Sequence, residues 1–458
     1  MNFEAGLQKL NDETAKIDSE AVKQLEALFD DGCFTQLDKF AMNENEPCEC
    51  VTAYGTVCGV MTFAFSGAKG ANGAMGKNMA QKIGKVYSLA EKVGAPVVGI
   101  YNSDGAHIDE GIDAMEAFAS LIAAASKLSG VVPQISVIAG DCVGSAAVLA
   151  TTADVVIMKN DAELYVTAGS ILADEKVGSA ELAAKNGTAA IIAETDEEIY
   201  NKVAEVITFL PQNNLVAPVV GEYYPASGNI ASTDAYEVIE GIADADSFLE
   251  LYKGYAEKAI VGFARINGAA TAIVATNSEK LDAAAASKIA RFVRFSDAFS
   301  IPVVTLLNSY GVLGNKEDEL SGGVKYASQL AHAYAEATTA KITVITGAAV
   351  GGAYIALASK AAGIDSVFAW PSAFISALEP KTAVELLMKD KLAEGESRED
   401  LANAYCDDEA SAFAAANKGY IEDVISPMET APRLALDLEM LSSKRVSTLN
   451  KKHSNIQL

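Results

Sequence analysis

The chain has few histidines and no long apolar run, and each shortage excludes a class of protein. Its 458 residues include only three histidines, His107, His332 and His453, and these form neither the HExxH pair of zinc proteases nor part of a nucleophile elbow. Apolar stretches are broken well before the length of about 18 residues that a membrane-spanning helix needs. The first residues also lack the apolar core of a secretory signal. We therefore expect a cytoplasmic protein.

Cysteine is scarce as well. The six cysteines are too few and too scattered for a disulfide framework. Cys48, Cys50 and Cys58 lie close together, but they lack the paired spacing of a zinc site. The sequence predicts reduced thiols and no metal.

Positive charge is also in short supply. The chain has 61 acidic and 35 basic residues, which gives a formal net charge of −26. Nucleic-acid binding needs a basic face, so this balance excludes it as a function. An anionic ligand would have to find a local group of cations.

One such group surrounds the glycine-rich segment 67–76. Its members are Lys69, Lys77, Lys82 and Lys85. Two interpretations stay open, a cradle for phosphates or a helix face that is simply solvated. The segment is not a nucleotide P-loop, because five residues instead of four separate Gly70 from Gly76, and Asn78 replaces the Ser or Thr that binds magnesium.

A glycine-rich turn, in contrast, occurs twice. Residues 135–146 and 342–353 align without a gap, so that Gly140 matches Gly347 and Gly144 matches Gly351. Each copy begins with a β-branched apolar run, which is typical of a buried strand, and continues with small residues that let a helix begin. Each turn is therefore expected to join a strand to a helix.

The repetition extends beyond the turn and indicates a gene duplication. Segment 97–105 matches 303–311, and segment 54–63 matches 263–272, in the same order and at nearly the same spacing. This period is far longer than that of solenoid repeats, so each copy is a domain. We expect one domain over residues 1–222 and a second over residues 223–458.

The duplicated turn favours chemistry through backbone groups. N–H groups left uncovered at the start of a helix can hold an oxyanion, and losing one such donor typically costs about 3 kcal/mol. A reaction through an enolate fits, because removal of a proton or of CO2 next to a thioester places negative charge on the carbonyl oxygen. The alternative interpretation is that the glycines only permit close contact between helix and strand.

Further segments resemble the biotin-dependent acyl-CoA carboxyltransferases, the family of the propionyl-CoA carboxylase β-subunit and the methylmalonyl-CoA decarboxylase α-subunit. The resemblance runs from about residue 54 to residue 458. Its landmarks, in chain order, are 94–100, 130–138, 209–214, 290–302, 333–338, 351–354, 369–372, 419–427 and 451–458. Each segment is modest alone, but their order and spacing together are specific.

The resemblance implies an α/β fold of two tandem crotonase-like domains, each a spiral of ββα units. The N-terminal domain, 1–222, would bind the acyl-CoA, and the C-terminal domain, 223–458, would bind carboxybiotin. The active site would lie between the N-terminal domain of one subunit and the C-terminal domain of another, within a homohexamer.

The resemblance also implies the site residues. The N–H groups of Gly144 and Ser145 would hold the thioester oxygen, and those of Gly352 and Ala353 would hold the ureido oxygen of biotin. Biotin released from its carboxyl group would itself take the α-proton, so that no histidine base is needed.

Substrate contacts follow from the same resemblance. Gly140, Cys142 and Ile355 would lie at the acyl-CoA, and Lys69 and Lys77 are the candidates for its phosphates.

The chain departs from the family pattern at several positions. Ser145 replaces a glycine in the first turn, Asp104 lies where a glycine is usual, Phe374 replaces a glutamate, and Glu379 replaces a glycine. At Ile355, an apolar residue next to the acyl pocket would alter the preference for chain length. These changes keep open an alternative function, a weak or inactive paralogue that acts as a scaffold in a biotin-dependent complex.

A biotin-independent crotonase-type hydratase or isomerase is a further alternative. The turns lack the pair of glutamates that such an enzyme needs, and the block 369–371 argues against it.

Partners follow from motifs that the sequence lacks. It has neither an ATP-grasp domain nor the A-M-K-M motif that carries biotin, so biotin must arrive on a separate carrier protein. The other subunits would be a biotin carboxylase or membrane decarboxylase subunits, and in the second case the chain would be peripheral to the membrane. The acyl-CoA pair stays open between propionyl/methylmalonyl-CoA and acetyl/malonyl-CoA.

Overall fold

The computed structural model describes residues 3–15, 19–43, 46–47, 50–67, 74–174 and 176–456. It divides the chain into two compact units, Met1–Ala217 and Pro218–Leu458. The division lies five residues before the predicted one at 222/223, because residues 220 and 221 already belong to the second unit. Val220 bridges to Ala269, and the N–H of Gly221 donates to the carbonyl of Gly268 at 2.8 Å.

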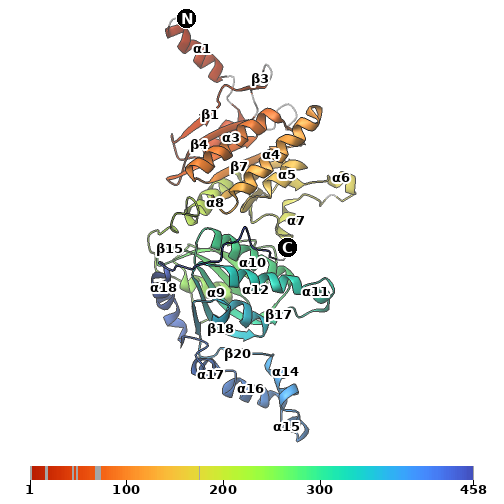
Figure 1. Ribbon diagram of the computed structural model, residues 1–458, viewed down its shortest axis with the longest axis vertical. Helices are drawn as coiled ribbons and strands as arrows, with labels where there is room; N and C mark the ends of the chain where they lie inside the picture. The colour runs from red at the N-terminus through yellow and green to blue at the C-terminus, as the bar shows by residue number, and fades with distance from the viewer. Residues whose placement is uncertain are drawn as a thin grey trace. The chain divides into compact units, whose positions relative to one another are not determined.

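The first unit is built on one mixed sheet (Figure 1). Its strands follow the spatial order β1-β4-β5-β7-β9-β10-β12, with β11 paired to β9. The strands are β1 (Phe34–Leu37), β4 (Cys50–Val57), β5 (Val60–Gly67), β7 (Val97–Ser103), β9 (Gln134–Val143), β10 (Val155–Lys159), β11 (Glu163–Tyr165) and β12 (Ile191–Ala193). β4 pairs antiparallel with both β1 and β5, whereas the strands from β5 onward are parallel. Two small ladders pair β2 (Met42–Asn43) with β3 (Glu46–Pro47) and β6 (Ala74–Met75) with β8 (Gly105–Ala106).

Among the described residues, the second unit repeats the strand path of this sheet and the short strand beside it, and adds one strand, β16. Its order is β13-β14-β15-β17-β18-β19-β21, with β20 paired to β18 and β16 paired to β17. The strands are β13 (Leu249–Leu251), β14 (Ala259–Ile266), β15 (Ala269–Thr276), β16 (Glu279–Leu281), β17 (Val303–Val312), β18 (Lys341–Val350), β19 (Ser366–Ala369), β20 (Phe374–Ser376) and β21 (Asp423–Val424). The switch from antiparallel to parallel pairing again follows the first hairpin. The predicted duplication is therefore confirmed at the level of topology.

Helices complete each unit. Those of the first unit are α1 (Phe3–Ala15), α2 (Glu20–Leu28), α3 (Lys77–Val93), α4 (Ile112–Leu128), α5 (Ser145–Ala150), α6 (Gly169–Leu172), α7 (Ala180–Lys185) and α8 (Asp196–Phe209). Those of the second are α9 (Ala235–Ile242), α10 (Ala283–Ala298), α11 (Lys316–Leu320), α12 (Val324–Glu336), α13 (Gly352–Leu357), α14 (Pro380–Leu387), α15 (Lys389–Ala393), α16 (Arg398–Asp408), α17 (Ala412–Asn417) and α18 (Thr430–Leu441). In the described part of the chain, no helix is both long and apolar enough to cross a membrane.

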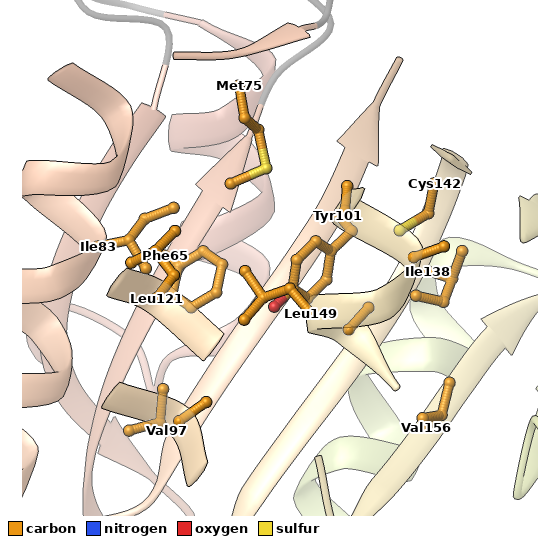
Figure 2. Close-up of a cluster of buried hydrophobic side chains, with 14 of the residues drawn as sticks. Phe65, Met75, Ile83, Val97, Tyr101, Leu121, Ile138, Cys142, Leu149 and Val156 are labelled. Carbon is orange, nitrogen blue, oxygen red and sulfur yellow. The ribbon is translucent and has the colours of Figure 1, made fainter. Parts of the chain in front are cut away.

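In the first unit the core lies between the sheet and the adjacent helices α3 and α4, whereas a core cluster of the second unit lies between its sheet and helices α9 and α18. Figure 2 shows this layer in the first unit, where Ile83 of α3, Leu121 of α4 and Leu149 of α5 meet Phe65 and Tyr101 of the sheet. All five side chains are at most 5% exposed. Burying an aliphatic or aromatic side chain of this size stabilises a fold by about 1.5–3 kcal/mol, so this layer fixes the helices on the sheet.

The turn of the β4–β5 hairpin and that of the β14–β15 hairpin are held by the same kind of hydrogen bonding. Cys58 and Gly59 form the turn between β4 and β5, Asn267 and Gly268 form that between β14 and β15, and all four have positive φ, as a type I′ turn requires. A carboxylate receives both turn N–H groups in each case. The donors lie 2.9 Å from Asp30 in the first unit, and 2.9 and 2.8 Å from Asp244 in the second.

A buried lysine is also repeated. Lys82 of α3 donates to the carbonyl of Cys50, the first residue of β4, at 2.6 Å. Lys288 of α10 donates to the carbonyl of Ala259, the first residue of β14, at 2.7 Å and to two further carbonyls. Burial lowers the pKa of Lys288 to about 8. Lys82 thus joins α3 to β4, and Lys288 joins α10 to β14.

The Asp30 clamp makes stability depend on pH. The donated N–H of Gly59 lowers the pKa of Asp30 below its usual 3.8, so the stabilisation is complete above the unfolded-state pKa and is lost as the pH falls through the folded-state pKa. We expect Asp30→Asn to lower the free energy of unfolding of the first unit by about 1 kcal/mol at pH 7, and by less below pH ~4. Chemical denaturation at both pH values measures this. Asp31→Asn, an exposed neighbour, is the control, and an equal loss in both variants would contradict the clamp.

Candidate active site

The two repeated turns have the same unusual backbone geometry. Gly144 joins β9 to α5 with φ 59° and ψ −127°, and Gly351 joins β18 to α13 with φ 50° and ψ −120°. A residue with a side chain is strained at such angles, so each position requires glycine. The sequence predicted these strand–turn–helix connections, and the structure has them at the same places in both units.

The N–H of the turn glycine itself is already used. Gly144 donates to the carbonyl of Tyr165 in β11 at 2.9 Å, and Gly351 donates to the carbonyl of Ser376 in β20, also at 2.9 Å. Gly144 was predicted to donate its N–H to an oxyanion, but the carbonyl of Tyr165 in the same unit already accepts this N–H. The reason is the short parallel strand that pairs beside each turn.

The next two N–H groups in each turn are differently placed. The first N–H groups of an α-helix have no acceptor within that helix. Among the described residues, those of Ser145 and Ala146 in the first unit make no hydrogen bond elsewhere, and neither do those of Gly352 and Ala353 in the second. These four groups occupy matching positions. Predicted donors Ser145, Gly352 and Ala353 are among them, and Ala146 takes the place of Gly144.

An asparagine packs against each turn from the neighbouring strand. A Cβ at Gly140 would lie 2.6 Å from Oδ1 of Asn102, and a Cβ at Gly347 would lie 2.5 Å from Oδ1 of Asn308. Oδ1 of Asn308 also accepts the N–H of Ala348 at 3.0 Å. Gly140 was predicted to contact substrate. The structure shows it making room for this amide, and its contact with substrate stays a prediction.

A serine beside each asparagine holds the next loop. The N–H of Gly105 donates to Oγ of Ser103 at 3.2 Å, and the N–H of Gly311 donates to Oγ of Ser309 at 3.3 Å. The strand register shifts at this point in both units. No role was predicted for these asparagines and serines. The signal was present, because both halves carry Asn-Ser-Xaa-Gly in the matched segments 97–105 and 303–311.

Cys142 faces the core. Its side chain is fully buried among the helix and strand side chains of Figure 2, and burial raises the pKa of its thiol to about 12. The thiol is therefore protonated at neutral pH and is neither a nucleophile nor a base. Its predicted substrate contact has no support from the side chain.

Ile355 is 60% exposed on α13, two residues after Ala353. An apolar side chain so exposed beside the turn is available to a ligand, and its place at the acyl pocket stays a prediction.

The described lysines of the predicted phosphate cradle have separate partners. Lys77 opens α3, and its Nζ lies 3.4 Å from Asp113. Lys85 pairs with Asp38 at 2.6 Å, whereas Lys82 points into the unit as described above. Lys69 lies outside the described residues. The solvated or structural interpretation therefore fits Lys82 and Lys85, whereas both interpretations stay open for Lys77.

Two further features of the sequence are His107 and the side chains that could bind a metal. His107 donates its backbone N–H to the carbonyl of Met75 at 3.0 Å, and its buried Nδ1 has no hydrogen-bond partner within the described residues. Among those residues, no group of three or more His, Cys, Asp or Glu side chains is arranged to hold a metal ion.

A cavity of about 380 Å³ lies in the second unit. It is lined by Lys258, Ser278, Glu279, Lys280, Asp282, Tyr310, Gly314, Asn315 and Glu379. The ring of Tyr310 packs against that of Phe374, with the ring centres 5.8 Å apart. Phe374 opens β20, the strand that accepts the N–H of Gly351, so this cavity is close to the second turn.

Known proteins resemble the chain over nearly its whole length. Residues 15–456 match the carboxyl transferase domain family. The chain is 33% identical to a propionyl-CoA carboxylase carboxyltransferase subunit of Haloferax mediterranei, with 96% of this chain and 93% of the relative covered. It is also 33% identical to a methylmalonyl-CoA decarboxylase subunit alpha of Veillonella parvula, with the same coverage.

A solved structure agrees with these relatives. Transcarboxylase 12S, described as a hexamer with methylmalonyl-coenzyme A bound, superposes with a TM-score of 0.94 at 29% identity and covers 100% of both chains. The predicted pair of crotonase-like α/β domains is thereby confirmed.

The strain at the turn predicts a measurable cost. No atom lies near a Cβ built at Gly144, so the Gly144→Ala variant measures the cost of the backbone conformation without a steric clash. We expect it to lower the free energy of unfolding by about 1–3 kcal/mol. Gly84→Ala is the matched control, because Gly84 lies inside α3 with open space around it. Alanine there should stabilise by up to about 1 kcal/mol. Chemical denaturation of both variants measures this, and a neutral Gly144→Ala would contradict the assigned geometry.

Proposed function

The chain belongs to the carboxyl transferase domain family, as its sequence predicted, and we propose that it moves a carboxyl group between biotin on a separate carrier protein and the α-carbon of a short acyl-CoA. The observation that carries this proposal is the match over residues 15–456 together with two strand–turn–helix sites of equal geometry. The names of the relatives favour propionyl-CoA and methylmalonyl-CoA as the acyl pair over acetyl-CoA and malonyl-CoA.

The first unit is proposed to act on the thioester. When the bond between the α-carbon and the carboxylate breaks, its electron pair passes to the thioester oxygen and forms an enolate. The N–H groups of Ser145 and Ala146 are positioned to donate to that oxygen, because no other acceptor among the described residues uses them. Such donors act more strongly on the enolate than on the neutral thioester, and this difference lowers the barrier.

The second unit is proposed to receive biotin. Biotin supplies or accepts the carboxyl group at a ureido nitrogen when its carrier presents it. The N–H groups of Gly352 and Ala353 fit the ureido oxygen for the same reason that their counterparts fit the thioester oxygen. The cavity near this turn gives the second unit room for a small bicyclic ligand.

Neither Cys142 nor Ser145 offers a general base at the first turn. The thiol of Cys142, with a pKa of about 12, stays protonated, and Ser145 contributes a hydroxyl that is weakly acidic. Proton transfer at the α-carbon is therefore assigned to the biotin that has lost its carboxyl group. The protein positions the reacting oxygens and leaves the proton to the ligand.

Selectivity and assembly are proposed on the same basis. The exposed apolar side chain of Ile355 would contact the acyl group and set its preferred length. The chain would work as a homohexamer in the cytoplasm, with a biotin carrier protein and either a biotin carboxylase or membrane decarboxylase subunits. Transcarboxylase 12S, which is described as a hexamer, supports the oligomer.

A scaffold role is the second candidate. The hydroxyl of Ser145 at the first turn and the ion pair of Glu379 with Lys280 across the second-unit cavity are the observations that favour it.

The direct test is whether the purified chain releases CO2 from methylmalonyl-CoA or malonyl-CoA in a manner that depends on added free biotin. We expect biotin-dependent release, faster with methylmalonyl-CoA. Absence of both turnover and CoA binding would instead establish the scaffold role.

Proline substitution tests the individual donor. Ser145 is the first residue of α5, where proline is tolerated by the helix but removes the N–H. The preceding Gly144 has the mirror image of extended backbone angles and no Cβ, so it accepts a following proline. We expect Ser145→Pro to lower kcat by about 10²–10³-fold with little change in stability. Ser145→Ala keeps the N–H and should retain activity. Equal activity in the two variants would remove Ser145 from the mechanism.

A further inference from the structure

The cavity of the second unit is crossed by an ion pair. Nζ of Lys280 lies 3.7 Å from Oε2 of Glu379, and both residues line the cavity. Lys280 belongs to β16, which pairs with β17, whereas Glu379 precedes α14 in the segment that follows β20. The pair therefore joins two walls that come from different parts of the sheet.

The lysine is held in this position by its own stem. A Cβ at Gly314 would lie 2.4 Å from Cδ of Lys280, so the aliphatic part of the side chain lies directly on the backbone of this cavity-lining glycine. A side chain fixed along its length loses little further freedom when its ammonium group pairs. Lys280 is thus poised to reach Glu379 across the opening.

The glutamate lies close in sequence to the second turn. Ser376 accepts the N–H of Gly351, and the carbonyl of Ala377 would lie 3.1 Å from a Cβ at Gly351. Glu379 follows two residues later and is the residue before the first of α14. The pair therefore ties the segment beside the turn to the opposite wall of the cavity.

The pair is weak enough to open. Its side chains are 44% and 41% exposed, and pairs of such exposure contribute little because water and salt screen them. The other lysine of the cavity, Lys258, is already placed between two carboxylates, 3.6 Å from Glu279 and 3.5 Å from Asp282. It does not compete for Glu379 at these distances.

We propose that the Lys280–Glu379 ion pair is a gate over the second-unit cavity, which must break before the biotin group enters. The gate rests on the proposed function for the identity of its ligand. It makes Glu379 and Lys280 determinants of affinity on the biotin side and leaves the acyl-CoA side unaffected.

The test compares KM for biotin methyl ester with KM for methylmalonyl-CoA. Glu379→Gln and Lys280→Met each remove one member of the pair, and each should lower KM for the ester by up to about fivefold with no change for methylmalonyl-CoA. The double variant should gain no more than either single variant, because the interaction can be lost only once. Glu385→Gln is the matched control, since Glu385 lies on α14 and pairs with Arg398 at 2.7 Å away from the cavity lining.

Three results would overturn the gate: an unchanged KM for the ester, an equal change in Glu385→Gln, or additive effects in the double variant. Calorimetric titration with biotin methyl ester separates the gate from the proposed function. If the wild-type chain shows no biotin-dependent turnover but Glu379→Gln binds the ester more tightly than Glu385→Gln does, the function fails and the gate stands. If none of the proteins binds the ester, the gate is wrong.

Discussion

The arrangement of each candidate site depends on the acceptor of one backbone N–H group, that of the turn glycine. At Gly144 and at Gly351 the chain leaves a parallel strand with positive φ, and the glycine N–H donates to a neighbouring short strand. This hydrogen bond fixes the direction in which the following helix begins. The next two N–H groups are then left without acceptors among the described residues, side by side at the start of the helix. A chain without glycine at these two positions would have to strain or rebuild both sites.

The rest of each unit holds this turn in place by repeated means. Asn102 and Asn308 pack over the glycine that precedes the turn, and Ser103 and Ser309 fix the adjoining loop. The hairpin clamps and the buried lysines are repeated as well, although they lie away from the turn. Interactions that are present in both copies of the duplicated domain stabilise the fold that the two units share. The pair of Lys280 with Glu379 lies in the second unit, and it is a place where the two copies can differ in function.

Much of this was predictable because it depends on residues close together in sequence. The turns and the duplication follow from glycine spacing and apolar runs, whereas the α/β fold was implied by the family resemblance. The acceptor of the Gly144 N–H could not be predicted from the sequence. It is the carbonyl of Tyr165, in a three-residue strand that carries no clear sequence pattern. The partners of Lys82 and Lys85 could not be predicted, because Cys50 and Asp38 come from distant segments. The domain boundary shifted because Val220 pairs with Ala269.

The central claim is that backbone N–H groups at the first turn polarise a thioester oxygen. Infrared difference spectroscopy of bound propionyl-CoA, labelled with ¹³C at the thioester carbonyl, tests it most directly. A carbonyl that accepts two hydrogen bonds should absorb at lower frequency than the same label in water, and Ser145→Pro should reverse part of that shift while Ser145→Ala should not. A bound carbonyl that absorbs as it does in water, or that shifts equally in both variants, would contradict the account.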